Sequence, residues 1–119
     1  MNASSRFTSV ERIKKTSEFS TVYNKGKRYF TKNLIVFVLD NKGGFNRLGL
    51  SISKKVGKAY IRNNWRRRLR EFFRLYKEKF GMGKDIVIVV KKEAGLLRKD
   101  AIWQSLENEM PTIFKKIVH

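Results

Sequence analysis

The sequence predicts an α/β fold with the order helix, two or three strands, helix, strand, helix. Short apolar runs at 33–40 and 84–92 are rich in Val and Ile, as strands are. The longer segments 58–80 and 97–117 instead repeat apolar residues every three or four positions, which indicates amphipathic helices. With 119 residues, of which 41% are apolar, the chain is expected to form one compact domain (1–119) with a modest core.

The first helix is expected to follow an extended lead-in formed by residues 1–15. Thr16 or Ser17 can cap this helix, and Glu18 in its first turn suits the positive end of the helix dipole. Gly26 stands where a glycine often ends a helix. The apolar face of the helix consists of Phe19, Val22 and Tyr23.

The strands are predicted from their apolar patterns. Residues 33–40 form the first clear strand, and the two glycines in 41–46 suit a hairpin connection. Residues 47–53 alternate large apolar side chains with smaller or polar ones, as a half-buried strand does. Residues 84–92 are β-branched between charged ends, which predicts a strand covered on both faces.

Two helices are predicted in the second half of the chain. The helix at 58–80 begins after Gly57, ends before Gly81 and should measure roughly 33 Å. The last helix contains Pro111, which lacks a backbone donor and clashes with the preceding turn. We therefore expect either a kink at Pro111 or a second short helix that begins there.

The charge distribution points to a polyanionic partner. The formal net charge is +18, and the stretch between Asn41 and Arg70 contains ten cationic residues and no acidic residue. Helical spacing places a row of cations, the basic ridge, along one side of the 58–80 helix, with Glu71 and Glu78 on its flank. The ridge consists of Lys58, Arg62, Arg66, Arg70 and Arg74, with Asn63 and Arg67 beside it. Uncompensated arginines one turn apart repel each other, so we expect the ridge to bind a polyanion, for which RNA is the best candidate.

Two other interpretations of the basic ridge remain open. A run of charges is often only a solvated helix face, although the repulsion between the arginines argues against this. A basic amphipathic helix can also lie on a membrane. Here, however, the apolar face centred on Trp65, Leu69 and Tyr76 is needed to cover the strands.

The sequence lacks the side chains of a protein-based catalytic centre or metal site. Cysteine is absent, the only histidine is the terminal His119, and the ten carboxylates are scattered without metal-ligand spacing. No glycine-rich phosphate loop is present. Residues 1–15 have no apolar signal-peptide core, and no apolar run is long enough to span a bilayer. We therefore expect a cytoplasmic protein without membrane contact.

A motif in the basic segment resembles the RNR signature of the bacterial ribonuclease P protein subunit. It has the form K-K-x-G-x-A-x-x-R-N, followed by several arginines and R-E. Its residues here are Lys54, Lys55, Gly57, Ala59, Arg62, Asn63, Arg66, Arg67, Arg68, Leu69, Arg70 and Glu71. Two positions depart from the family pattern. Asn64 occupies the place of the second arginine of the RNR triplet, and Pro111 interrupts a final helix that is usually continuous.

The resemblance implies a compact two-layer α–β sandwich of αβββαβα order, with the basic helix in a left-handed crossover between parallel strands. It also implies the protein component of an endoribonuclease that matures the 5′ end of tRNA. In that enzyme a catalytic RNA holds Mg²⁺ and cleaves precursor tRNA, while the protein assists. The ridge, together with Lys54, Lys55 and Asn64, is expected to contact the catalytic RNA.

Aromatic residues near the N-terminus are expected to form a second site. In the family, the positions of Phe19, Tyr23 and Phe37 form the floor of a cleft for the single-stranded leader of precursor tRNA. Exposed aromatic rings suit this role because they stack on unpaired bases without demanding a sequence. The alternative is that these rings belong to the core. Residues expected to flank the cleft are Lys54, Lys55, Lys91 and Lys92, with Tyr29 and Phe30 as further candidates.

The competing hypothesis is a structural RNA-binding protein of the ribosomal type without an enzymatic role. A DNA-binding protein or a stand-alone nuclease fits the residues less well. The aromatic patch beside a separate basic helix discriminates between the first two, because a scaffold protein needs phosphate contacts but no leader cleft.

Overall fold

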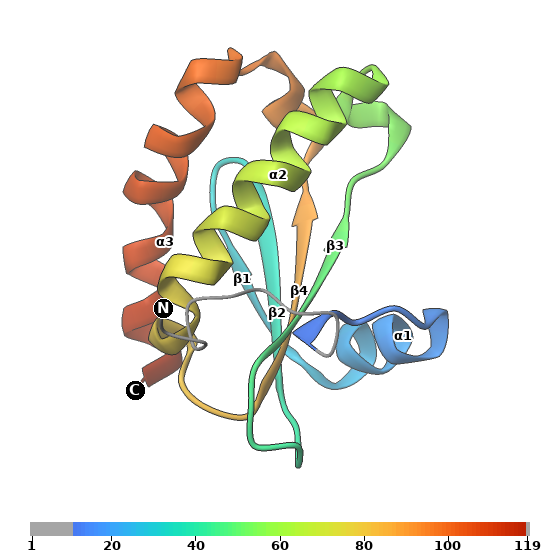
Figure 1. The fold of residues 1–119 in the computed structure, drawn as a ribbon, viewed down its shortest axis with the longest axis vertical. Coiled ribbons are helices and arrows are strands. Elements are labelled where there is room, and N and C mark those ends of the chain that lie inside the picture. Colours follow the sequence, from blue (N-terminus) through green and yellow to red (C-terminus); the bar gives the residue numbers. More distant parts are fainter. Residues whose placement is uncertain (1–10, 119) are drawn as a thin grey trace, which may run out of the picture.

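The computed structural model describes residues 11–118, and the predicted αβββαβα order is confirmed in this part of the chain (Figure 1). The helices are α1 (Thr16–Lys25), α2 (Ala59–Tyr76) and α3 (Ile102–Val118). The strands are β1 (Lys27–Phe30), β2 (Leu34–Asp40), β3 (Arg47–Ser51) and β4 (Lys84–Val90). Short 3₁₀ turns are η3 (Lys54–Val56), η4 (Lys77–Phe80), η5 (Lys92–Leu96) and η6 (Lys99–Ala101).

The four strands form one sheet in the order β1-β2-β4-β3. β2 pairs antiparallel with both β1 and β4, whereas β3 lies parallel to β4. The chain therefore passes from β3 through α2 to the neighbouring parallel strand β4. In Figure 1, α2 lies in front of the sheet and β4 lies to the left of β3, so this crossover is left-handed, as the resemblance implied.

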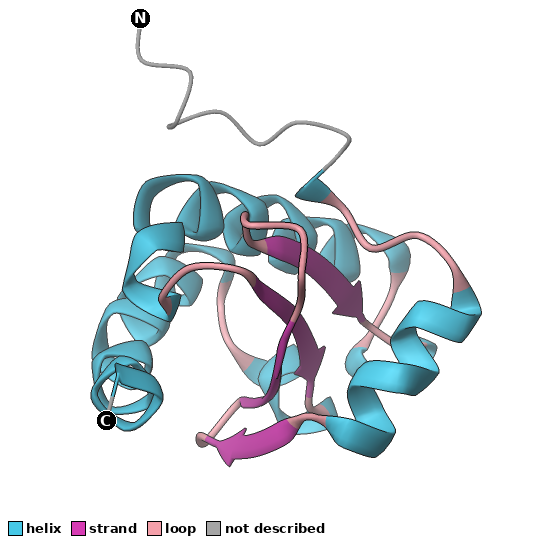
Figure 2. Cartoon of the chain, turned by 90° about the horizontal axis from the view of Figure 1, so that it is seen from below, coloured by secondary structure: helices cyan, strands magenta, loops and turns pink. Residues whose placement is uncertain are grey.

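The two faces of the sheet carry different helices. Alternate residues of β4 divide between them: Ile86 and Ile88 belong to the main core under α2 and α3, and Val87 to a smaller cluster under α1. The helices accordingly lie on both sides of the strands in Figure 2. The main core is a sandwich of the sheet with α2 and α3, and its largest fully buried side chains include Trp65, Phe73, Phe80, Leu106 and Met110.

Residues 11–13 form an N-terminal strap along the outer edge of β3. The backbone N–H of Ile13 donates to the carbonyl of Leu48 at 2.9 Å, and Arg12 forms a parallel bridge with Leu48. Glu11 and Lys77 form an ion pair of 2.6 Å in which both side chains are largely buried. The expected extended lead-in is thus fixed against the fold from Glu11 onward, and its first ten residues lie outside the described range.

The start of α1 differs from the predicted cap. Lys15 is the residue that precedes the helix, and neither Thr16 nor Ser17 caps it. The carboxylate of Glu18 instead accepts a hydrogen bond of 3.4 Å from the backbone N–H of Lys15. At the other end, Gly26 is extended rather than left-handed. Its lack of a side chain is still required, because a Cβ there would lie 2.6 Å from the carbonyl oxygen of Val22.

The basic helix is shorter than predicted, because α2 ends at Tyr76 and residues 77–80 tighten into η4. The buried Asn46, in the loop before β3, holds this end. Its Nδ2 donates to the carbonyls of Lys77 and Gly81 at 2.7 Å each, and its Oδ1 accepts from the backbone N–H of Lys84 at 2.8 Å. A single amide therefore joins the end of the helix to the start of β4.

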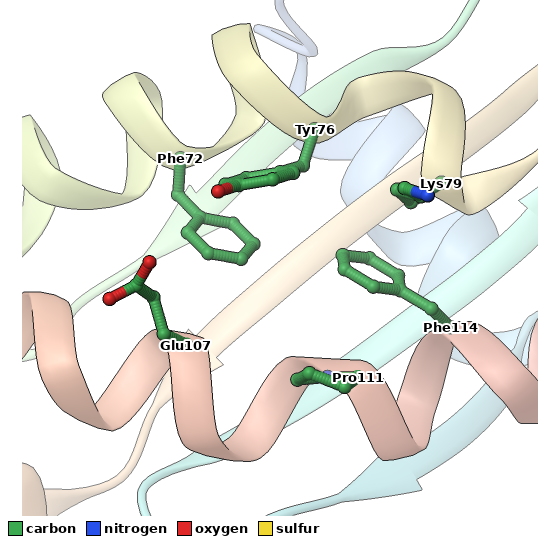
Figure 3. Close-up of a pocket in the computed structure, with 6 residues that line it drawn as sticks. All are labelled: Phe72, Tyr76, Lys79, Glu107, Pro111 and Phe114. Carbon is green, nitrogen blue, oxygen red and sulfur yellow. The ribbon is translucent and has the colours of Figure 1, made fainter.

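Pro111 does not split the last helix, and the prediction of a second helix beginning there is wrong. α3 continues through Pro111, whose ring lines an open hollow of about 350 Å³ between α2 and α3 (Figure 3). Glu107, whose carbonyl loses the usual helical donor because Pro111 has no N–H, lies one turn earlier and lines the same hollow. Met110 and Ile113 on the other side of the helix are buried in the core. Their packing keeps the helix continuous despite the missing hydrogen bond.

Candidate nucleic-acid interface

The buried side of α2 determines which residues form its outer surface. Trp65, Leu69 and Phe73 are almost completely buried, and the indole Nε1 of Trp65 donates to the carbonyl of Ala94 at 3.2 Å. These contacts fix the rotation of the helix about its axis. The arginines of the basic ridge therefore lie along one flank of the buried face, where each of them is half-buried, and the fully outward side of the helix carries Asn63 and Arg67.

The ridge arginines are held by short contacts along the helix. Arg62 donates from Nε to the carbonyl of Gly57 at 3.1 Å, and Arg66 donates from Nη1 to Oδ1 of Asn63 at 2.6 Å. A guanidinium has five N–H donors, so each of these contacts leaves most of the donors available to a phosphate. Arg67 lies beside them and is exposed.

Arg70 is a partly buried member of the ridge with other cations nearby. Its pKa is lowered, first by burial and then by the positive charges of Arg12 and Arg66. Arg12 belongs to the N-terminal strap, so a residue from outside the RNR-like motif adds its charge to the ridge. A guanidinium remains charged at neutral pH despite such a shift. An anion bound among these three side chains would relieve their repulsion.

Arg74 differs from the rest of the ridge because it pairs with Glu71. Its Nε donates to Oε2 of Glu71 at 3.2 Å, and its Nη2 donates to Oε1. This hydrogen bonding lowers the pKa of Glu71 and raises that of Arg74. Glu71 thus reaches the end of the ridge instead of remaining on its flank, and the charge of Arg74 is compensated within the protein.

Three exposed lysines lie at the start of the ridge or just before it. Lys54 and Lys55 lie in η3, whose turn is capped by the Ser53 hydroxyl accepting from the backbone N–H of Lys55 at 3.3 Å. Lys58 precedes the first residue of α2. Between them, Gly57 has φ of 154°, and a Cβ there would lie 2.9 Å from Cδ1 of Ile61. Glycine is therefore required where the chain turns from η3 into the helix.

The predicted aromatic residues come together on the opposite face of the sheet. The rings of Tyr23 and Phe37 meet edge to face with centroids 4.9 Å apart, and Phe19 and Tyr23 are 6.3 Å apart. All three side chains are only partly buried, around Val22 and Val87. They form an aromatic face that is rooted in the smaller core cluster and partly open to solvent.

A glycine of the sheet makes room for the aromatic face. A Cβ on Gly49 of β3 would lie 2.8 Å from both Cε1 and Cζ of Phe19, so the Phe19 ring rests directly on the backbone of the strand. Such an approach is possible only at glycine. Gly49 was not singled out in the sequence, because its role depends on the docking of α1.

The two further aromatic candidates separate onto different faces. Tyr29 packs against the main core under α2 and α3, so its proposed place in the cleft is wrong. Phe30, the next residue of β1, pairs with Ile35 and points to the other side of the sheet, where 61% of its surface is exposed. Phe30 therefore lies on the same side as Phe37.

The predicted flanking lysines lie at one end of the sheet. Because β3 and β4 are parallel, Lys54 and Lys55 after β3 lie at the same end as Lys91 and Lys92 after β4. Lys91 donates from Nζ to the carbonyl of Thr31 at 3.0 Å, whereas Lys92 is exposed. The arrangement gathers these cations at the carboxyl ends of β3 and β4.

An ion-pair network that the sequence did not reveal fixes α1 on the sheet. Arg47 of β3 donates to Asp85 of β4 at 2.7 and 2.9 Å and to Glu18 of α1 at 2.9 Å. The pKa of Arg47 is raised, chiefly by its hydrogen bond to Asp85, and that of Glu18 is lowered, chiefly by its hydrogen bond to Arg47. The network therefore orients the helix that carries Phe19 and Tyr23.

Comparison with known proteins identifies the family. A family profile described as Ribonuclease P matches residues 7–117. The chain belongs to the ribonuclease P protein family. As a member, it is a protein subunit of ribonuclease P, the endoribonuclease of tRNA 5′ maturation, and the ribosomal-type alternative is not favoured.

Individual ribonuclease P proteins are similar over most of the chain. The ribonuclease P protein component of Fusobacterium nucleatum is 39% identical over 87% of this chain and 93% of its own length. The ribonuclease P protein component of Clostridioides difficile is 37% identical over 92% of this chain and 94% of its own length. The solved structure of the Staphylococcus aureus RNase P protein superposes with a TM-score of 0.78 at 34% identity, covering 87% of this chain and 94% of that one. The solved structure of the Thermotoga maritima RNase P protein superposes with a TM-score of 0.70 at 28% identity, covering 82% of this chain and 93% of that one.

Within residues 11–118, no three His, Cys, Asp or Glu side chains come together as a possible metal site. Over the same range, no helix is both long and apolar enough to cross a bilayer.

Proposed function

We propose that this ribonuclease P subunit binds two RNA segments on opposite sides of its sheet. The basic ridge and its preceding lysines hold the catalytic RNA, and the aromatic face holds the 5′ leader of precursor tRNA. The observation that carries this proposal is the placement of the two surfaces. Because α2 covers one face of the sheet and α1 with Phe37 covers the other, both RNA segments can be bound at once.

The two surfaces suit different parts of RNA. Arg62, Arg66 and Arg70 present guanidinium groups, which match phosphate geometry and release condensed counterions when they bind. Phe19 and Tyr23 offer rings for stacking with unpaired bases, while Lys91 and its neighbouring lysines can hold the phosphates between those bases. A duplex would not enter such an aromatic face, so the single-stranded leader is the appropriate ligand.

The chemical step is assigned to the RNA subunit, together with the Mg²⁺ that it requires. Several acidic side chains of the protein are already engaged by cations, which makes them poor ligands for magnesium. Asp85 and Glu18 pair with Arg47, Glu11 pairs with Lys77, and Asp40 pairs with Lys84. The protein accordingly contributes binding and positioning of the substrate, in the cytoplasm where tRNA precursors are processed.

Reconstitution tests this proposal. The purified protein alone should not cleave precursor tRNA, whereas with ribonuclease P RNA and Mg²⁺ it should increase kcat/KM for precursor tRNA. The increase in kcat/KM should be larger for precursor tRNA than for a substrate with a one-nucleotide leader, because so short a leader offers too few bases to stack on the aromatic face. Equal stimulation with both substrates would contradict the leader-binding role, and metal-dependent cleavage without RNA would contradict the assignment of chemistry to the RNA.

A further inference from the structure

A hollow of about 360 Å³ lies between the first turns of α2 and the segment that joins β4 to α3. The side chains relevant here are Tyr60 and Asn64 of α2, and Leu96, Leu97, Arg98 and Lys99 of the joining segment. The lining thus combines an aromatic ring, an amide, aliphatic side chains and two cations.

Tyr60 and Leu96, which line this hollow, are not part of the core. Tyr60 is 64% exposed and Leu96 is 89% exposed, which is costly for large apolar side chains with no covering partner. Leu97 beside them packs against the main core, so the floor of the hollow is fixed. The hollow is therefore a rigid depression with an exposed ring on its rim.

The polar groups of the hollow are available to a ligand. Asn64 is half-buried, and its side chain makes no hydrogen bond within residues 11–118, although an amide can both donate and accept. Arg98 approaches Asp100 only at 3.6 Å, with both side chains largely exposed. Lys99 is also exposed. One amide and two cations therefore face an aromatic and aliphatic wall.

We propose that this hollow binds one unpaired nucleotide of the ribonuclease P RNA. The base stacks on Tyr60 and contacts Leu96, the Asn64 amide hydrogen-bonds to the edge of the base, and Arg98 and Lys99 hold the adjoining phosphates. The volume is at the lower end of small-ligand sites, which suits a single nucleotide and not a larger group. This inference rests on the proposed contact between the ridge and the same RNA.

The position of the hollow assigns it to the catalytic RNA and not to the leader. By helical spacing, Asn64 lies on the flank of α2 opposite Arg62 and Arg66. The exposed Arg67 lies one turn from both Asn63, beside the ridge, and Asn64, so the outer face of α2 links the hollow to the ridge. The aromatic face proposed for the leader lies across the sheet. Asn64 also stands where the RNR signature has its second arginine. An uncharged amide at that place reads a base edge, whereas an arginine would add another phosphate contact.

Binding of in vitro transcribed ribonuclease P RNA to Tyr60→Ala and Asn64→Ala tests the inference. We expect about 5- to 100-fold weaker binding for Tyr60→Ala, and an unchanged salt dependence, because no charge is removed. Tyr60→Phe keeps the ring and should bind like the unmodified protein. Leu75→Ala, at an exposed position farther along α2, is the matched control and should also bind normally. Thermal unfolding establishes that each variant is folded.

Chemical probing of the RNA provides a second readout. One unpaired nucleotide should be protected by the unmodified protein and by Tyr60→Phe, and should become reactive with Tyr60→Ala. Normal affinity and an unchanged protection pattern for Tyr60→Ala would overturn the inference while leaving the ridge contact intact. A loss seen only with precursor tRNA would overturn the assignment to the catalytic RNA. Failure of the proposed function is recognised separately, because ridge variants would then bind this RNA normally.

Discussion

Arg47 and Asp85 form a two-point ion pair across the parallel strands β3 and β4, with Nη2 2.7 Å from Oδ2 and Nε 2.9 Å from Oδ1. The remaining Nη1 of Arg47 reaches Glu18 on α1 at 2.9 Å. The planar guanidinium therefore joins two strands and a helix in a way that a lysine could not. The consequence is functional, because α1 carries two of the three rings of the aromatic face.

Substitution of Arg47 should affect both stability and the aromatic face. Arg47→Ala leaves the mostly buried Asp85 without its cation, so we expect the free energy of unfolding to fall by about 2–4 kcal/mol. Arg47→Lys should recover only part of this loss. Urea denaturation measures the change. Equal stability of Arg47→Lys and the unmodified protein would contradict the two-point geometry.

The same network predicts a pH dependence. The pKa of Glu18 is lowered from its ordinary value of 4.5 in the folded protein, so its contribution to stability is complete above that value. The contribution is lost as the pH falls through the lowered pKa. Glu18→Gln should therefore be less stable than the unmodified protein at neutral pH, and the difference should shrink in acid. A difference that is constant from pH 7 to the acid limb would contradict the role of the Glu18 carboxylate.

The ridge should govern the salt dependence of RNA binding. Arg62→Ala, Arg66→Ala and Arg70→Ala should each weaken binding of ribonuclease P RNA and reduce the slope of log affinity against log salt by about one unit. If six or more phosphates are contacted, the unmodified protein should lose roughly 10³-fold in affinity between 50 and 200 mM salt. Lys115→Ala, an exposed cation on α3, is the control and should leave the slope unchanged. Normal binding of the triple arginine variant would exclude the ridge as the contact.

Pro111 predicts a stabilising substitution. Pro111→Ala restores a backbone donor inside α3 at a solvent-exposed position, where no packing has to change. We expect the free energy of unfolding to rise by about 2 kcal/mol, since part of the helical gain is offset by the greater freedom of the unfolded chain. RNA affinity should not change, because Pro111 belongs to α3 and the substitution leaves the ridge on α2 as it is. Thr112→Ala, the exposed neighbour, serves as the control, and a decrease in stability for Pro111→Ala would show that the proline is needed in the hollow.

The order of the elements and the ridge could be predicted because both depend on local patterns. The rotation of α2 follows from the spacing of Trp65, Leu69 and Phe73, and the direction of Arg66 and Arg70 follows from it. The failure at Pro111 has the opposite cause. Proline disfavours a helix locally, but burial of Met110 and Ile113 outweighs that preference, and burial depends on the whole fold.

The features that escaped prediction all depend on contacts between distant segments. Arg12 joins the ridge only because the strap pairs with Leu48, and Gly49 matters only because α1 docks on it. Tyr29 was assigned to the wrong face because the orientation of β1 follows from its register with β2, which a four-residue strand does not reveal.

Phe19 should contribute to binding of the leader more than to assembly with the catalytic RNA. If its ring stacks on a base, Phe19→Ala should cost about 1–3 kcal/mol in affinity for precursor tRNA and nothing for mature tRNA, which has no leader. Phe19→Tyr keeps the ring and should retain the preference for precursor over mature tRNA.

Gly49→Ala offers a second test that leaves the Phe19 ring intact. The added Cβ would lie 2.8 Å from the ring and must displace it. This variant should therefore also lose part of the preference for precursor over mature tRNA. A purely structural Phe19 would behave differently, since Phe19→Ala would then lower the melting temperature and weaken binding of both tRNA forms alike. Measuring melting temperatures and both affinities for the three variants decides between the two roles.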